Sequence, residues 1–112
     1  MPKPSHRLSS VYTQSATKLL GLLIREQRIK KKMTTTDLSI RSGISRSLLQ
    51  RIENGDTSCS IGAFFEAATI VGVSLFNLDE KSIPQAIHHQ QDILTLLPSK
   101  IRPSKVDFND DF

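Results

Sequence analysis

The sequence is poor in cysteine and has no long apolar run. Cys59 is the only cysteine among 112 residues, so a disulfide within the chain is excluded. A membrane-spanning helix takes about 20 consecutive apolar residues, and no segment of this chain comes near that length. Residues 1–10 also lack the apolar stretch of a secretory signal. These absences lead us to expect a cytoplasmic protein without a membrane partner.

The sequence also lacks the residue sets that catalytic and metal sites require. We find no Ser, His and Asp set with catalytic spacing, no glycine-rich phosphate loop and no cluster of metal ligands. His88 and Asp92 stand one helical turn apart, but a metal site needs at least a third ligand. We therefore expect a binding protein and not an enzyme, with neither a cofactor nor a metal.

Positive charge is concentrated in the first third of the chain. The whole chain carries 15 Lys and Arg against 11 Asp and Glu, a formal net charge of +4. Residues 1–32 hold eight of the basic residues and a single acid, Glu26, whereas residues 79–112 hold four basic and six acidic residues. Such a basic region favours a polyanion such as nucleic acid as partner. Lys30 to Lys32 are also explained without a partner, because cations stabilise the last turn of a helix.

Two short helical patterns meet at Gly43, and they are the most informative part of the chain. Thr34 is placed to cap the first helix, and Asp37, three residues later, to complete a capping box. Gly43 supplies the positive φ that a tight turn needs, and Ser45 caps the next helix. Two short capped helices joined by such a turn are typical of a DNA-binding helix-turn-helix.

The second of these helices has an apolar and a polar side. Leu48, Leu49 and Ile52 recur at helical spacing and predict the buried side. The polar side chains left for a partner are Arg46, Ser47, Gln50 and Arg51. Asn54 and Gly55 then end the helix in a turn.

The other apolar patterns predict helices as well. A broad stripe predicts a first helix of about four turns from Ser15; it consists of Leu19, Leu20, Leu22, Leu23, Ile24 and Ile29. Ser60 is placed to cap a strongly apolar fourth helix that Gly72 closes, and Ser74 to cap a short fifth helix that runs to Leu78. The fold class is therefore all-α.

These elements divide the chain into four parts. We expect a flexible N-terminal arm over residues 1–14 and a five-helix DNA-binding domain over residues 15–79. A linker with one short helix follows over residues 80–98. The polar, charged residues 99–112 form a flexible tail.

Residues 33–55, followed by Gly72-Val73-Ser74-Leu75, resemble the Xre group of lambda-repressor-like helix-turn-helix domains. Glu53-Asn54-Gly55 is the most specific part of the match, which covers about residues 15–79. The resemblance implies a five-helix lambda-repressor-like fold. Thr35 stands where the family often has Gln, and Cys59 where it often has Pro. These two departures are expected to affect phosphate anchoring and not the fold.

The resemblance also implies roles for the polar residues of this region. In such domains the recognition helix enters the major groove with its N-terminus first, which gives base contacts to Arg46, Ser47, Gln50 and Arg51. Phosphate contacts are implied for Thr35, Asn54, Thr57, Ser58 and Ser60. By the same resemblance Glu53 pairs with Arg28 of the first helix and is structural.

The residues after the domain are similar to the C-terminal part of HipB-like antitoxins, which repress their own operon and bind a HipA-like kinase toxin. The similarity rests on the short helix between Pro84 and Pro98, the basic residues that follow it and the terminal Asp110-Asp111-Phe112. It implies an autoregulating repressor with a HipA-like kinase toxin as partner. The alternatives are a phage-type or metabolic Xre regulator without a toxin, and a protein-interaction module that mainly scaffolds a partner.

Base reading by a single helix covers only a few base pairs. We therefore expect a homodimer that binds a palindromic operator in double-stranded DNA and is associated with the nucleoid when bound. The dimer interface involves either the fourth and fifth helices or the short helix after the domain. The sequence leaves that choice open.

Overall fold

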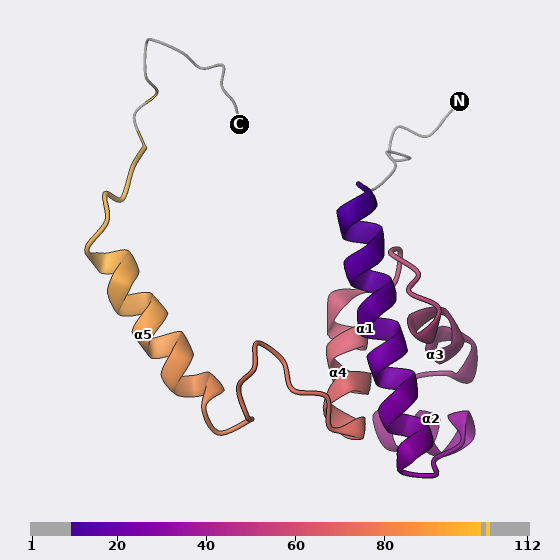
Figure 1. Ribbon diagram of the computed structural model, residues 1–112. Coiled ribbons are helices and arrows are strands. Elements are labelled where there is room, and N and C mark those ends of the chain that lie inside the picture. Colours follow the sequence, from indigo (N-terminus) through magenta and orange to yellow (C-terminus); the bar gives the residue numbers. More distant parts are fainter. Residues whose placement is uncertain (1–9, 102, 104–112) are drawn as a thin grey trace. The chain divides into compact units, whose positions relative to one another are not determined.

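A computed structural model describes residues 10–101 and 103 of the chain, which divides into two units, residues 1–77 and 78–112. The described residues form five helices and no strand (Figure 1). These helices are α1 (Val11–Lys30), α2 (Thr35–Ser42), α3 (Arg46–Glu53), α4 (Ile61–Val71) and α5 (Ile83–Thr95). The predicted all-α class is confirmed.

Side-chain caps fix where the three shorter helices of the first unit begin. The Thr34 hydroxyl accepts a hydrogen bond from the Asp37 amide at 3.0 Å, and the Asp37 carboxylate accepts one from the Thr34 amide at 2.9 Å. Ser45 and Ser60 cap α3 and α4 in the same way through their hydroxyls. Gly43 has a φ of 74° and ends α2 in the left-handed conformation. The predicted turn between α2 and α3 is therefore present.

The core of the first unit lies where α1, α2, α3 and α4 meet (Figure 1). Leu38 of α2, Leu49 and Ile52 of α3 and Val71 of α4 are completely buried. Full burial of one such side chain contributes about 1.5 to 3 kcal/mol of transfer free energy. The two helices of the motif thus share one core with α1 and α4.

Gly21 lets α1 approach the end of α3 very closely. A Cβ at this position would lie 2.8 Å from the carbonyl oxygen of Glu53 and closer still to that of Ile52. Any side chain here would push the two helices apart. Gly21 therefore sets the position of α3 relative to α1, a role that the sequence pattern did not reveal.

The structure corrects the prediction of a fifth domain helix over residues 74–78. Phe76 and Asn77 have φ values of 58° and 56°, and two consecutive left-handed residues cannot continue a right-handed helix. The ring of Phe76 packs edge-to-face on Phe65 of α4, with 6.2 Å between the ring centroids. This contact outweighs the helical spacing of Leu75 and Leu78.

The first helix also differs from its prediction at its start and on its surface. It begins at Val11, where the Ser10 hydroxyl caps it, so the last four residues of the expected arm are helical. Of the predicted apolar stripe only Ile24 is buried and Leu20 packs partly on the core. The other four side chains are 39 to 57% exposed: Leu19, Leu22, Leu23 and Ile29.

The second unit contains the predicted short helix, α5, which begins with Pro84 in its first turn. No residue of α5 is buried. None of the described helices is both long enough and apolar enough to cross a bilayer. Residues 1–9 of the predicted arm, and residues 102 and 104–112 of the predicted tail, lie outside the described part.

Candidate nucleic-acid interface

The polar side of α3 begins at its exposed N-terminus. Leu49 and Ile52 hold the opposite side of the helix in the core. Arg46, Ser47 and Gln50 are exposed and line an open hollow together with Thr35 of α2. The start of α2 and the polar side of α3 therefore form one continuous surface, with base-reading candidates and a phosphate-contact candidate side by side.

Arg46 is the least constrained cation of this surface. Its Nη1 lies 3.4 Å from the Thr36 hydroxyl, an exposed and long hydrogen bond. The guanidinium therefore keeps most of its donors for a partner. Arginine presents these donors as a planar fork that matches O6 and N7 of guanine.

A second hollow connects α3 to α1. Its lining residues are Arg25, Arg28, Thr35, Gln50, Glu53 and Asn54. Arg25 was not among the predicted site residues, because in the sequence it is one of several cations late in the first helix. Its position three residues before Arg28 is the signal that could have placed it on the same side of α1. Arg25, Thr35 and Asn54 bring one cation and two neutral polar groups to this hollow.

Arg28 and Glu53 form the ion pair that ties α3 to α1. Nε of Arg28 donates to Oε2 of Glu53 at 2.7 Å, and Nη2 donates to Oε1 at 3.0 Å. Nη1 also donates to the Met33 carbonyl at 2.9 Å. The side chains are only 12% and 7% exposed, and the hydrogen bonds to Glu53 raise the pKa of Arg28. Both groups are therefore engaged by protein partners, which makes them scaffold residues.

Arg51 is held by the loop after α3 instead of extending freely from the helix. Its Nε donates to Asp56 at 3.0 Å and its Nη2 donates to the Ser58 hydroxyl at 2.7 Å. The same hydroxyl donates to Asp56 at 2.7 Å. Hydrogen bonds from Ser58, with a further one from Arg51, lower the pKa of Asp56 to about 2. Sequence reasoning treated Arg51 and Ser58 as separate contact residues and missed that Asp56 links them.

The rest of this loop presents different groups. Thr57 is exposed, whereas the Ser60 hydroxyl accepts from the Ala63 amide and is used in the helix cap. Cys59 is partly buried against the core, and this burial raises the pKa of its thiol. A raised pKa lowers the thiolate fraction, which makes Cys59 less reactive at neutral pH.

The histidine and carboxylate pair of α5 stands by itself in the part of the chain that the structure describes. His88 Nε2 lies 3.7 Å from the Asp92 carboxylate. Within residues 10–101 and 103, no three His, Cys, Asp or Glu side chains gather closely enough to hold a metal ion.

Comparison with known proteins gives one result that agrees with this geometry. A family model described as a helix-turn-helix domain matches residues 19–80, a segment that contains α2, α3 and α4 and the part of α1 from residue 19 onward. No curated protein and no solved structure matches the chain. The family match covers more than half of the chain, and its segment includes the surface formed by α2 and α3. The chain therefore belongs to the helix-turn-helix domain family, whose fold points to a DNA-binding regulator.

Proposed function

We propose that this protein is a sequence-specific transcriptional repressor that binds a palindromic operator as a homodimer. The observation that carries the proposal is the exposed polar side of α3, on which Arg46, Ser47 and Gln50 share a hollow with Thr35. The buried side of the same helix is fixed by the core. A helix held in this way presents its donors in one orientation, as base recognition requires.

Arg46 and Ser47, in the first turn of α3, are the leading base readers. Gln50 lies one turn further along and is suited to adenine, which it can contact through two hydrogen bonds. Arg51 reads a base only after it leaves Asp56 and Ser58. Its contribution to affinity is therefore reduced by the hydrogen bonds that it gives up.

Phosphate contacts are assigned to two places beside the recognition helix. At the first, Arg25 joins Thr35 and Asn54 around the hollow between α1 and α3, close to the positive end of the α2 dipole. At the second, Thr57, Ser58 and Ser60 follow α3 in the loop. These groups contact the backbone and position α3 without reading sequence.

Selection of bound fragments from random double-stranded DNA tests the proposal directly. The expected result is a palindrome whose half-sites are separated by about 34 Å, one helical turn. Affinity is expected to fall steeply with salt because phosphate contacts release counterions. Failure to enrich any sequence would overturn the proposal.

Single substitutions assign the readers within that experiment. Arg46→Ala is expected to relax base preference and weaken operator binding roughly tenfold or more, in line with the loss of a two-pronged base contact. Arg41→Ala is the matched control, because Arg41 is an exposed arginine near the end of α2 and lines neither hollow. Equal losses in both variants would reduce the role of Arg46 to net charge.

Asp56→Asn tests the role of Arg51. The substitution weakens the ion pair that holds Arg51 and removes a negative charge near the DNA backbone, so operator affinity is expected to rise. In the Arg51→Ala background, Asp56→Asn is expected to raise operator affinity less. There it only removes a negative charge near the DNA backbone, because no arginine is left to release. Identical effects of Asp56→Asn in both backgrounds would show that Arg51 does not reach the DNA.

We further propose that the regulator is an Xre-type antitoxin that controls its own operon together with a HipA-like kinase toxin. The support is the resemblance of residues 33–55 to Xre domains and of the C-terminal residues to HipB-like antitoxins. Purification of the untagged native complex tests it. A stoichiometric kinase supports the antitoxin function, a DNA-bound dimer alone supports a phage-type or metabolic regulator, and a different stoichiometric protein without operator binding supports an interaction module.

A further inference from the structure

The apolar side of α5 has no cover within its own unit. Ile87, Ile93 and Leu94 are 52%, 37% and 58% exposed, and Leu97 just after the helix is 54% exposed. A chain segment that left these side chains in water would gain nothing from their apolar character. We therefore expect a partner to cover this side of α5, and the pattern of its residues indicates what kind of partner that is.

The apolar residues of α5 are arranged symmetrically about Gln90. Apolar residues lie seven, four and three positions before Gln90 and three, four and seven positions after it. At 3.6 residues per turn the five of them that belong to α5 fall on one side of the helix with Gln90 at its centre, and the sixth, Leu97, lies just after the helix. They are Ile83, Ala86 and Ile87 before it, and Ile93, Leu94 and Leu97 after it.

We propose that α5 pairs antiparallel with α5 of a second copy of this chain, with the two-fold axis at Gln90. A two-fold interface requires a surface that is complementary to itself, so that residue i meets j and j meets i. The spacing about Gln90 meets that requirement. It places Ile87 beside Leu94 of the second copy, and Ile83 near the end of the second α5, which Leu97 follows.

The charges in and around α5 agree with this partner. Within α5 only Asp92 is a fixed charge, and it lies beside His88 on the side opposite Gln90. No unpaired charge would therefore be buried when two such faces meet. A partner with a charged face would leave its charges without counterparts on α5.

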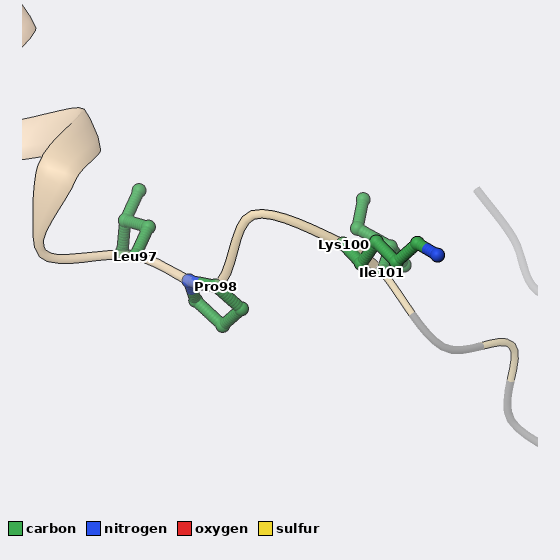
Figure 2. A pocket seen from close by; sticks show the side chains of 4 residues that line it. All are labelled: Leu97, Pro98, Lys100 and Ile101. Carbon is green, nitrogen blue, oxygen red and sulfur yellow. The ribbon is translucent and has the colours of Figure 1, made fainter.

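The two ends of α5 carry opposite charge, which favours the antiparallel direction. Asp79, Glu80 and Lys81 precede the helix and together carry a net charge of −1, whereas Lys100 follows it. Lys100 lines an apolar hollow with Leu97, Pro98 and Ile101, and Figure 2 shows these side chains along one short stretch of chain. Antiparallel pairing brings this stretch to the acidic start of the other α5, whereas parallel pairing would bring the acids together.

Gln90 has a specific place in this interface. It is the one polar residue on the apolar side and would face Gln90 of the second copy, where the two amides can exchange hydrogen bonds. A polar pair at a single central position fixes register at some cost in stability. The Gln90 pair therefore fixes how the two α5 helices are aligned, while the apolar side chains stabilise their contact.

The inference rests on the homodimer of the proposed function, which it supplies with an interface. Sedimentation equilibrium of the full chain provides the first test. Leu94→Glu, on the apolar side, is expected to weaken self-association at least about tenfold. Gln91→Glu is the matched control because it adds the same charge to α5 at a position outside the apolar side. A monomeric wild-type chain, or equal effects of both variants, would overturn the inference.

Disulfide trapping tests the antiparallel arrangement in a Cys59→Ser background. Chains with Ile87→Cys mixed with chains with Leu94→Cys are expected to give a mixed disulfide dimer under mild oxidation, whereas neither chain alone does so. Absence of the mixed dimer at concentrations where the wild type is dimeric would overturn the pairing. The pairing would also be overturned if the chain is monomeric and Leu94→Glu lowers the stability of its first unit. In that case the apolar side of α5 would pack within its own chain.

Operator binding separates the failure of this inference from the failure of the proposed function. If Leu94→Glu abolishes the dimer, binding to a single half-site is expected to persist while the preference for the full palindrome is lost. A dimer that binds no DNA sequence specifically would support the α5 interface and overturn the repressor function. A Leu94→Glu variant that still binds the operator as a dimer would support the repressor function and overturn the α5 interface.

Discussion

Both units contain amphipathic helices, yet only those of the first unit bury a set of apolar side chains in a common core. Leu38, Leu49, Ile52 and Val71 are completely buried by contacts among α1 to α4. No residue of α5 is buried. Helical periodicity therefore identifies an apolar side but does not determine what covers it. In the first unit the cover is the chain itself, and for α5 we infer a second copy.

The largest effect is expected where a buried charge holds the first unit together. Glu53→Ala leaves the Arg28 guanidinium with only the Met33 carbonyl among its present partners. Loss of one member of a buried pair costs about 3 kcal/mol of unfolding free energy. Urea denaturation measures it, and Glu66→Ala on the exposed surface of α4 is the control. Similar losses in both variants would contradict the structural role of the pair.

A smaller loss is expected where two helices approach most closely. Gly21→Ala forces α1 away from the carbonyl groups at the end of α3 and should cost about 2 kcal/mol through overpacking. Gly62→Ala in α4 meets no atom within 4 Å, so the higher helix propensity of alanine should stabilise the protein. Thermal unfolding of the two variants should therefore shift in opposite directions. Shifts of the same sign would break the argument.

The helix caps sharpen the contrast between the two units. Thr34→Ala removes the hydroxyl that accepts from the Asp37 amide and should cost about 1 kcal/mol. Ser82 holds the corresponding position of α5, but its side chain makes no cap hydrogen bond. Ser82→Ala is therefore expected to change the unfolding free energy less. Denaturant titration of both variants decides, and a larger loss from Ser82→Ala would refute the comparison.

The smallest effect is expected from acid. The cap hydrogen bonds to Thr34 lower the pKa of Asp37, and bonds from Ser58 and Arg51 lower that of Asp56 to about 2. A carboxyl group whose pKa is lower in the folded than in the unfolded state stabilises the fold. This contribution is complete at pH values above its pKa in the unfolded state, about 4, and is lost as the pH falls toward 2. Unfolding measured between pH 5 and pH 2 should show a shallower decline in Asp56→Asn. An unchanged decline would show that Asp56 contributes nothing.

Much of the first unit was predictable because its signals are local. Thr34 with Asp37, Gly43, Ser45 and Ser60 act within a few residues of their own position, so their roles were predicted and the structure contains them. The prediction for residues 11–14 was wrong although its signal is also local, because the cap at Ser10 was overlooked. The prediction for residues 74–78 was wrong for another reason, since a ring contact between Phe65 and Phe76 outweighed the local pattern.

The candidate site divides in the same way. Arg46, Ser47 and Gln50 follow from one helix and its buried side, and the structure leaves them exposed. The inclusion of Arg25 in the site depends on how α1 lies against α3. The hydrogen bonds that hold Arg51 depend on the path of the loop after α3, which brings Asp56 and Ser58 back to it. Neither arrangement can be read from spacing alone.

Caps, glycine conformations and helical periodicity act over a few residues, so the all-α class, the turn between α2 and α3 and the polar side of α3 were predictable from the amino acids alone. The packed structure was needed to show how closely α1 approaches α3 at Gly21, which apolar side chains of α1 stay in solvent, and whether Arg51 is free. These outcomes depend on atoms far apart in the chain, whose distances are fixed only when the helices pack.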